Sequence, residues 1–205
     1  MLFLLKGILL GFSIAAPVGP IGVLCIRRTL ANGMRNGFLS GLGAATADAI
    51  YGLLAVLGIS VVSIFLLEYQ SYLHMIGGIF LLYLGYTTFK ARPAEVSANA
   101  SEEELLGAYG STLLLTITNP MTIMSFAAIF AGLGVGAANE SYLSSLFLVL
   151  GVFIGSMLWW LFLSGMVNML RHKFDQKRLK LVNQLSGLVI TIFGICSLIS
   201  ITPSP

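Results

Sequence analysis

The chain has 205 residues, of which 57% are hydrophobic and only 9% are charged, and its formal net charge is +3. Soluble domains carry about 25% charged residues, so this composition excludes an ordinary soluble protein and indicates an integral membrane protein surrounded by a lipid bilayer. The basic residues lie in short stretches that flank apolar ones, which explains the positive charge without a nucleic-acid partner.

Six apolar stretches are long enough to cross a bilayer, which takes roughly 20 residues of helix. They cover residues 3–26, 37–67, 72–89, 105–134, 142–170 and 181–201. A membrane β-barrel would show segments of alternating polarity instead, and none is visible. The sequence therefore predicts an all-α polytopic membrane protein with six transmembrane helices.

The first span contains "SIAAPVGPIGVL", with Pro17, Gly19 and Pro20 in the middle of an apolar run. A proline lacks the backbone N–H and clashes with the carbonyl four residues earlier, so the carbonyls of Ser13 and Ala16 lose their helical partners. Unpaired backbone groups are tolerated in a membrane only where they line a cavity. We therefore predict a broken helix at a cavity, with a new helix beginning near Pro20.

The second span contains Asp48, which is the only ionisable residue well inside a predicted helix. A carboxylate near the bilayer centre costs about 2.5 to 3.5 kcal/mol and is a functional candidate by default. Small residues and Tyr51 share its helix face, so the side chain should point into the protein. It could bind a substrate ammonium, carry a proton, or simply hydrogen-bond a neighbouring helix while protonated.

The fourth span is interrupted in the same way as the first, by Asn119 and Pro120 in "TITNPMTIMSF". Here Pro120 frees the carbonyl of Thr116, and Asn119 is a favourable N-cap for the helix that follows. In the fifth span, Trp159 and Trp160 lie deeper than the aromatic belt, so we expect packing or lipid contacts, with a place in a cavity lining for one of them as the alternative.

The distribution of basic residues predicts the orientation of the chain. The first, third and fifth connections share one side of the membrane and hold ten of the 11 Lys and Arg residues: Arg27, Arg28, Arg35, Lys90, Arg92, Arg171, Lys173, Lys177, Arg178 and Lys180. The positive-inside rule places these connections in the cytoplasm and both termini outside. Lys6 lies inside the first apolar run, so we expect this helix to be retained rather than cleaved as a signal peptide.

The chain divides into two three-helix halves, 1–89 and 105–205, joined by a solvated cytoplasmic linker at 90–104. "GGIFLLYLGY" in the first half aligns with "SGLVITIFGI" in the second, with Gly78 matching Gly187 and Gly85 matching Gly194. Because each half has an odd number of spans, a repeat must be inverted, and the two proline breaks then fall at equivalent depths. Secondary transporters with this architecture bind substrate near the bilayer midplane, where the halves meet.

A site made of exposed carbonyls and helix N-termini has the polarity of a zwitterion, because carbonyls accept from an ammonium group and helix N-termini attract a carboxylate. This pattern suits an amino acid. A second interpretation, a cation or metal-ion exporter, uses the same carbonyls and Asp48 as ligands, although no His or Cys cluster favours a transition metal. A membrane enzyme is disfavoured, since one buried acid offers neither a nucleophile with a base nor a pair of acids.

The N-terminal "GFSIAAPVGPIGVLCIRRTLANGMRNGFLSGLGAATADAIYGLL", together with "IGGIFLLYLGYTTFKAR" and "TNPMTIMSF", resembles the LysE/RhtB amino-acid exporter family over essentially the whole chain. The resemblance implies export of a small amino acid or related metabolite from the bacterial cytoplasm, in exchange for protons and without a cofactor. The positions that carry over are Pro17, Gly19, Pro20, Asp48, Asn119 and Pro120. Val18 separates Pro17 from Gly19 where the family often has Pro-Gly-Pro, so the substrate stays undefined. The small-residue faces are compatible with a homodimer or with packing inside a monomer.

Overall fold

A computed structural model describes residues 2–17, 19–56, 70–91, 102–119, 122, 125–126, 142–173 and 176–199. Within these ranges all regular structure is helical and no strand is present. In chain order the elements are α1 (Leu2–Ala15), α2 (Pro20–Asn32), α3 (Met34–Val56), α5 (Gln70–Lys90), α6 (Glu102–Ile117), α8 (Tyr142–Leu170), the short 3₁₀ helix η1 (Arg171–Lys173) and α9 (Gln176–Ile199).

Three of the described helices, α3, α8 and α9, are each long and apolar enough to cross a membrane. Helices α1 and α2 are together long and apolar enough to form one more span. This span is broken, since the two helices meet at a bend of 82°. The chain is therefore a multi-pass membrane protein, and its regular structure is helical throughout the described residues. The second part of the predicted second span, the end of the predicted fourth span and most of the linker lie outside the described residues.

The helix boundaries correct several sequence predictions. Helix α2 continues to Asn32, so Arg27 and Arg28 are helical rather than part of a loop, because both side chains reach polar partners on neighbouring helices. The three glutamates at 102–104 begin α6 instead of ending the linker, where negative charge favours the helix N-terminus. Helix α9 begins at Gln176, ahead of the predicted start at residue 181. The fifth span, 142–170, is confirmed by α8.

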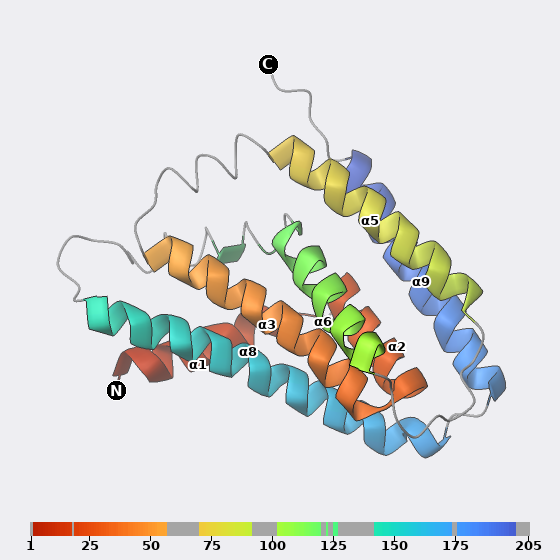
Figure 1. Ribbon diagram of the computed structural model, residues 1–205, viewed down its shortest axis with the longest axis horizontal. Coiled ribbons are helices and arrows are strands. Elements are labelled where there is room, and N and C mark those ends of the chain that lie inside the picture. Colours follow the sequence, from red (N-terminus) through yellow and green to blue (C-terminus); the bar gives the residue numbers. More distant parts are fainter. Residues whose placement is uncertain are drawn as a thin grey trace.

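Helix α1 lies against α8, and α3 packs on both α8 and α6 (Figure 1). Glycines allow the close approach of α1 and α8: a Cβ added to Gly11 would lie 2.0 Å from the carbonyl oxygen of Val152. A Cβ on Gly155 would similarly lie 2.1 Å from the carbonyl oxygen of Ile8. Backbone-to-backbone contact of this kind is how small residues drive helix association in lipid.

Helices α5 and α9 form a second pair at the other side of the molecule (Figure 1). Their four matched glycines touch in two places. A Cβ on Gly85 would lie 3.0 Å from the carbonyl oxygen of Gly187, and a Cβ on Gly194 would lie 3.0 Å from that of Gly78. The glycines that the sequence alignment paired thus lie at the interface between α5 and α9.

Polar contacts gather the three basic connections at one end of the bundle. Arg171 donates through Nε to the carbonyl of Leu30 and through Nη2 to that of Ala31, both at 3.1 Å. Arg27 Nε donates to Asn183 Oδ1 at 3.2 Å, and Asn183 Nδ2 donates to the carbonyl of Ala91 at 3.2 Å. We call this end, where α2, α5 and α8 finish and α3, α6 and α9 begin, the basic end.

Candidate functional site

The break in the first span has the geometry that its prolines dictate. Helix α1 ends at Ala15, and Pro20 is the first residue of α2, where its missing N–H costs nothing. Gly19 is the N-cap residue of α2 and has an extended conformation (φ −104°). Because glycine has no side chain, no side-chain hydrogen bond from this residue caps the first N–H groups of α2. The start of α2 therefore offers a positive helix end.

In the predicted fourth span, α6 ends at Ile117, just before the predicted break. The sequence predicted a free carbonyl at Thr116, and this prediction is wrong. The Asn119 N–H donates to that carbonyl at 3.2 Å, so a tighter final turn replaces the lost helical bond. The hydroxyl of Tyr51 donates to the carbonyl of Ile117, which ties α3 to the end of α6. The Thr122 N–H bonds the carbonyl of Asn119 at 3.1 Å, and Pro120 lies outside the described residues.

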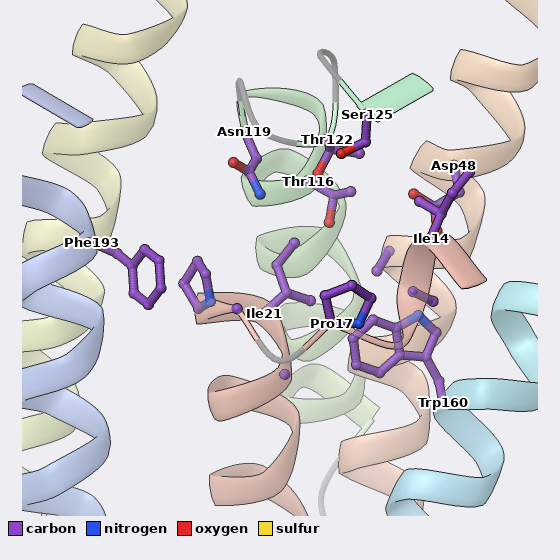
Figure 2. A pocket seen from close by; sticks show the side chains of 15 residues that line it. Ile14, Pro17, Ile21, Asp48, Thr116, Asn119, Thr122, Ser125, Trp160 and Phe193 are labelled. Atoms are coloured by element: carbon purple, nitrogen blue, oxygen red, sulfur yellow. The ribbon is translucent and has the colours of Figure 1, made fainter. Parts of the chain in front are cut away.

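A cavity of about 300 Å³ lies between the two breaks (Figure 2). Its lining includes five of the residues predicted from the sequence, namely Pro17, Gly19, Pro20, Asp48 and Asn119. Tyr51 is buried beside the cavity without being part of the lining that the described residues form. Segments about a hundred residues apart in the sequence therefore meet around one internal space.

The cavity lining contains both polar and apolar side chains. Figure 2 shows Asn119, Thr122 and Ser125 near the top of the view, with Ile21 and Trp160 below them and Phe193 at the left edge. The cavity thus presents hydroxyl and amide groups to one part of a ligand and an apolar surface to another.

Asp48 is held in place by a hydrogen-bonded chain that starts on α8. The hydroxyl of Ser156 donates to Asp48 Oδ2 at 2.7 Å, and the Trp160 indole N–H donates to Ser156 Oγ at 3.2 Å. Asp48 is only 4% exposed, which confirms that it points into the protein. Ser156 is its hydrogen-bond partner among the described residues, and Oδ1 has none there.

Ser156 and the cavity residues Thr122, Ser125 and Phe193 were not predicted from the sequence. Trp160 is 4% exposed and packs in the apolar core, and it also lines the cavity, which was the alternative for one of the two tryptophans. Trp159 packs edge to face on Phe12, with 5.2 Å between ring centroids. Ser156 and Trp160 are four residues apart on one helix face, a spacing that would have pointed to their shared surroundings.

The electrostatics of the cavity depend on Asp48. It is the one ionisable side chain among the described lining residues. The sequence has no Lys or Arg between Arg35 and Lys90 or between Arg92 and Arg171. A ligand carboxylate in the cavity would therefore be met by hydroxyls, amides and the N-terminus of α2, while a ligand ammonium would face Asp48.

Comparisons with known proteins identify the family of the chain. The model of the LysE type translocator family matches residues 12–200. The "Putative amino acid efflux protein YcgF" of Bacillus subtilis (strain 168) is 27% identical over 195 residues, which cover 93% of this chain and 92% of that protein. No solved structure matches the chain.

Two further relatives show how the names within this group of similar proteins vary. A "Leucine efflux protein" of Klebsiella pneumoniae is 27% identical over 189 residues, covering 89% of this chain and 88% of the relative. The "Chemotactic transduction protein ChpE" of Pseudomonas aeruginosa is 26% identical over 175 residues, covering 82% and 83%. Since the family model spans nearly the whole chain, this protein is a member of the LysE type translocator family.

Proposed function

We propose that the protein exports an amino acid or a closely related metabolite through the cavity between its two helix breaks. The observation that carries the proposal is the meeting of Asp48, the N-terminus of α2 and the end of α6 around one space of about 300 Å³. The amino acid efflux names of the Bacillus subtilis protein YcgF and of the Klebsiella pneumoniae protein favour the same substrate class.

The substrate would lie with its ammonium group toward Asp48 and its carboxylate toward the N-terminus of α2 and the amide of Asn119. A carboxylate at a helix N-terminus is stabilised by the free N–H groups and by the helix dipole. The apolar surface formed by Ile21, Trp160 and Phe193 would then receive an uncharged side chain. A second cationic group in the substrate would find no acidic partner among the described lining residues.

Transport would be coupled to protons through Asp48. A carboxyl group so deeply buried can alternate between a protonated form and a form paired with an ammonium. Ser156 can donate to the ionised form at Oδ2. Loss of the proton on one side of the membrane and its return on the other would link substrate release to the proton gradient.

An inverted repeat would supply the two states of the transport cycle. The packing supports such a repeat: α1 lies on α8 as α6 lies on α3, which are corresponding pairs in the two halves. The glycine contacts have the same symmetry. When each glycine is replaced by its counterpart in the other half, the contact of Gly78 with Gly194 becomes the contact of Gly187 with Gly85. Rocking of one half against the other around the fixed cavity would open it to each side in turn.

The test is efflux from cells loaded with dipeptides, which release free amino acids inside. We expect at least one amino acid to leave faster when the protein is present, and Asp48→Asn to abolish the increase. Tyr109→Phe is the matched control, because it removes only the bond from the Tyr109 hydroxyl to Thr46, away from the cavity. Unchanged efflux in Asp48→Asn, at equal protein level, would remove Asp48 from the mechanism. Metal-dependent growth differences without amino-acid efflux would favour cation export instead.

A further inference from the structure

The Arg28 side chain, on α2, is bound by two neighbouring helices. Its Nη1 lies 2.9 Å from each of three acceptors, Ser40 Oγ on α3 and the Ala108 carbonyl and Thr112 Oγ1 on α6. Its Nη2 donates to Ser111 Oγ at 2.7 Å. Because Nη1 has two protons and three acceptors, one proton is shared between two of the acceptors. Arg28 is thus the main polar connection between α2 and α6.

All four acceptors are neutral, which is unusual for a partly buried guanidinium. In the described ranges no carboxylate pairs with Arg28, and neither Nε nor the second proton of Nη2 has an acceptor. A guanidinium has five N–H donors, and its Nε–Nη2 edge has the geometry for two parallel bonds to a carboxylate. Arg28 therefore carries an unbalanced positive charge and an edge suited to an anion.

Arg28 lies between the cavity and the basic end of the molecule. Pro20, in the cavity lining, is eight residues before Arg28 on α2, which corresponds to about 12 Å of helix. Ser40 is likewise eight residues before Asp48 on α3, and Thr112 is one turn before Thr116 on α6. A solute that moves along these helices between the basic end and the cavity must pass the level of Arg28.

We propose that Arg28 is a second carboxylate-binding site, which takes the substrate on its way from the basic end to the cavity. The substrate carboxylate binds the Nε–Nη2 edge, where it competes with the Ser111 hydroxyl for Nη2. An ionic acceptor then replaces the neutral Ser111 hydroxyl, so binding weakens the connection between α2 and α6 and opens the way to the cavity. This inference rests on the proposed function, because it takes the substrate to be an amino acid that enters at the basic end.

A native cysteine can report this opening. Cys25 lies three residues before Arg28 on the same helix and is fully buried, whereas Cys196 is exposed. In a Cys196→Ser background, labelling of Cys25 by a maleimide would therefore measure how often α2 separates from its neighbours. The measurement needs no transport, so it distinguishes opening from coupling.

The experiment uses purified full-length protein with leucine as ligand and leucinamide, which lacks the carboxylate, as its control. If the efflux assay identifies another amino acid, that amino acid and its amide replace them. We expect the amino acid to accelerate labelling of Cys25 and the amide to have no effect. Arg28→Gln should label quickly with or without ligand, and its KM for efflux should rise roughly tenfold, as expected for the loss of a charged hydrogen-bonded contact.

Two more variants separate carboxylate binding from a purely structural role. Arg28→Lys keeps the charge but loses the paired donors, so it should fold and respond weakly to the amino acid. Arg27→Gln removes a neighbouring guanidinium that binds Asn183 on α9, and should respond as the unmodified protein does. An equal effect of the amide, or a normal response in both Arg28 variants, would overturn the inference. Absence of any amino-acid efflux would instead overturn the proposed function.

Discussion

At the scale of single residues, the site depends on how one carboxyl group is held. Asp48 accepts a hydrogen bond from the Ser156 hydroxyl, and Ser156 Oγ in turn accepts one from the Trp160 indole N–H. A buried carboxyl group without such a donor would be free to rotate away from the cavity and would lose a bond that favours its ionised form. Ser156 is therefore a positioning residue for Asp48, and Trp160 positions Ser156 while also lining the cavity.

Replacement of Ser156 by alanine tests this chain of hydrogen bonds. Loss of a hydrogen bond to a charged group costs about 1.5 to 3 kcal/mol, so we expect Ser156→Ala to lower efflux at limiting substrate about tenfold or more. The measurement is initial efflux rate against substrate concentration at matched protein level.

Ser164 is the control for this substitution, on the same helix. Its buried hydroxyl has no hydrogen-bond partner among the described residues. Ser164→Ala should therefore leave both efflux and stability unchanged or slightly improved. Equal losses in the two variants would show that Ser156 matters for packing and not for Asp48.

At the scale of helices, small residues decide which elements lie in contact. Gly7 and Gly11 on α1 face Gly151 and Gly155 on α8, and in each case an added Cβ would overlap backbone atoms of the other helix. Such contacts hold α1 close to α8, which fixes the end of α1 and therefore the break at Pro17. The position of the cavity is in this sense a result of glycine packing.

A pair of glycine substitutions tests this account of α1. A Cβ on Gly11 would lie 2.0 Å from the Val152 carbonyl oxygen, so Gly11→Ala should destabilise the folded protein by about 1 to 3 kcal/mol through overpacking. The measurement is thermal unfolding in detergent.

Gly110 on α6 provides the matched comparison, since a Cβ there would meet nothing within 4 Å. Alanine has the higher helix propensity, so Gly110→Ala should be neutral or stabilising by up to about 1 kcal/mol. If Gly11→Ala proved as stable as Gly110→Ala, the close approach of α1 and α8 would be wrong.

At the scale of the whole molecule, the sequence predicted much of the architecture. The apolar stretches located the helices, and the prolines at 17 and 20 located the bend between α1 and α2, because proline acts locally. Asp48 was identified because a charge inside an apolar span is costly. These are properties that a single stretch of sequence carries.

Features that depend on two distant segments could not be predicted in this way. The bond from Ser156 to Asp48 and the place of Trp160 in the cavity follow from the packing of α3 on α8. Likewise, Arg27 and Arg28 looked like loop residues because they are charged, although their partners on α3, α6 and α9 keep them helical. Such partners lie far away in the sequence, so they cannot be predicted from the residues around Arg27 and Arg28.

The orientation of the whole chain remains a prediction, and it can be tested with single cysteines. The basic connections meet at one end, so the positive-inside rule places that end in the cytoplasm. In a chain without native cysteines, Lys177→Cys should react with an impermeant maleimide only after the cells are permeabilised, and Lys6→Cys should react in intact cells. The reverse pattern would show that the basic end faces outward.

The most direct test of the central claim is an experimental structure of the purified protein saturated with the amino acid that it exports. We expect the ligand in the cavity between the two breaks, with its ammonium group within hydrogen-bond distance of Asp48 and its carboxylate near the start of α2. A ligand bound elsewhere, with the cavity at Asp48 closed or filled by side chains, would contradict the account.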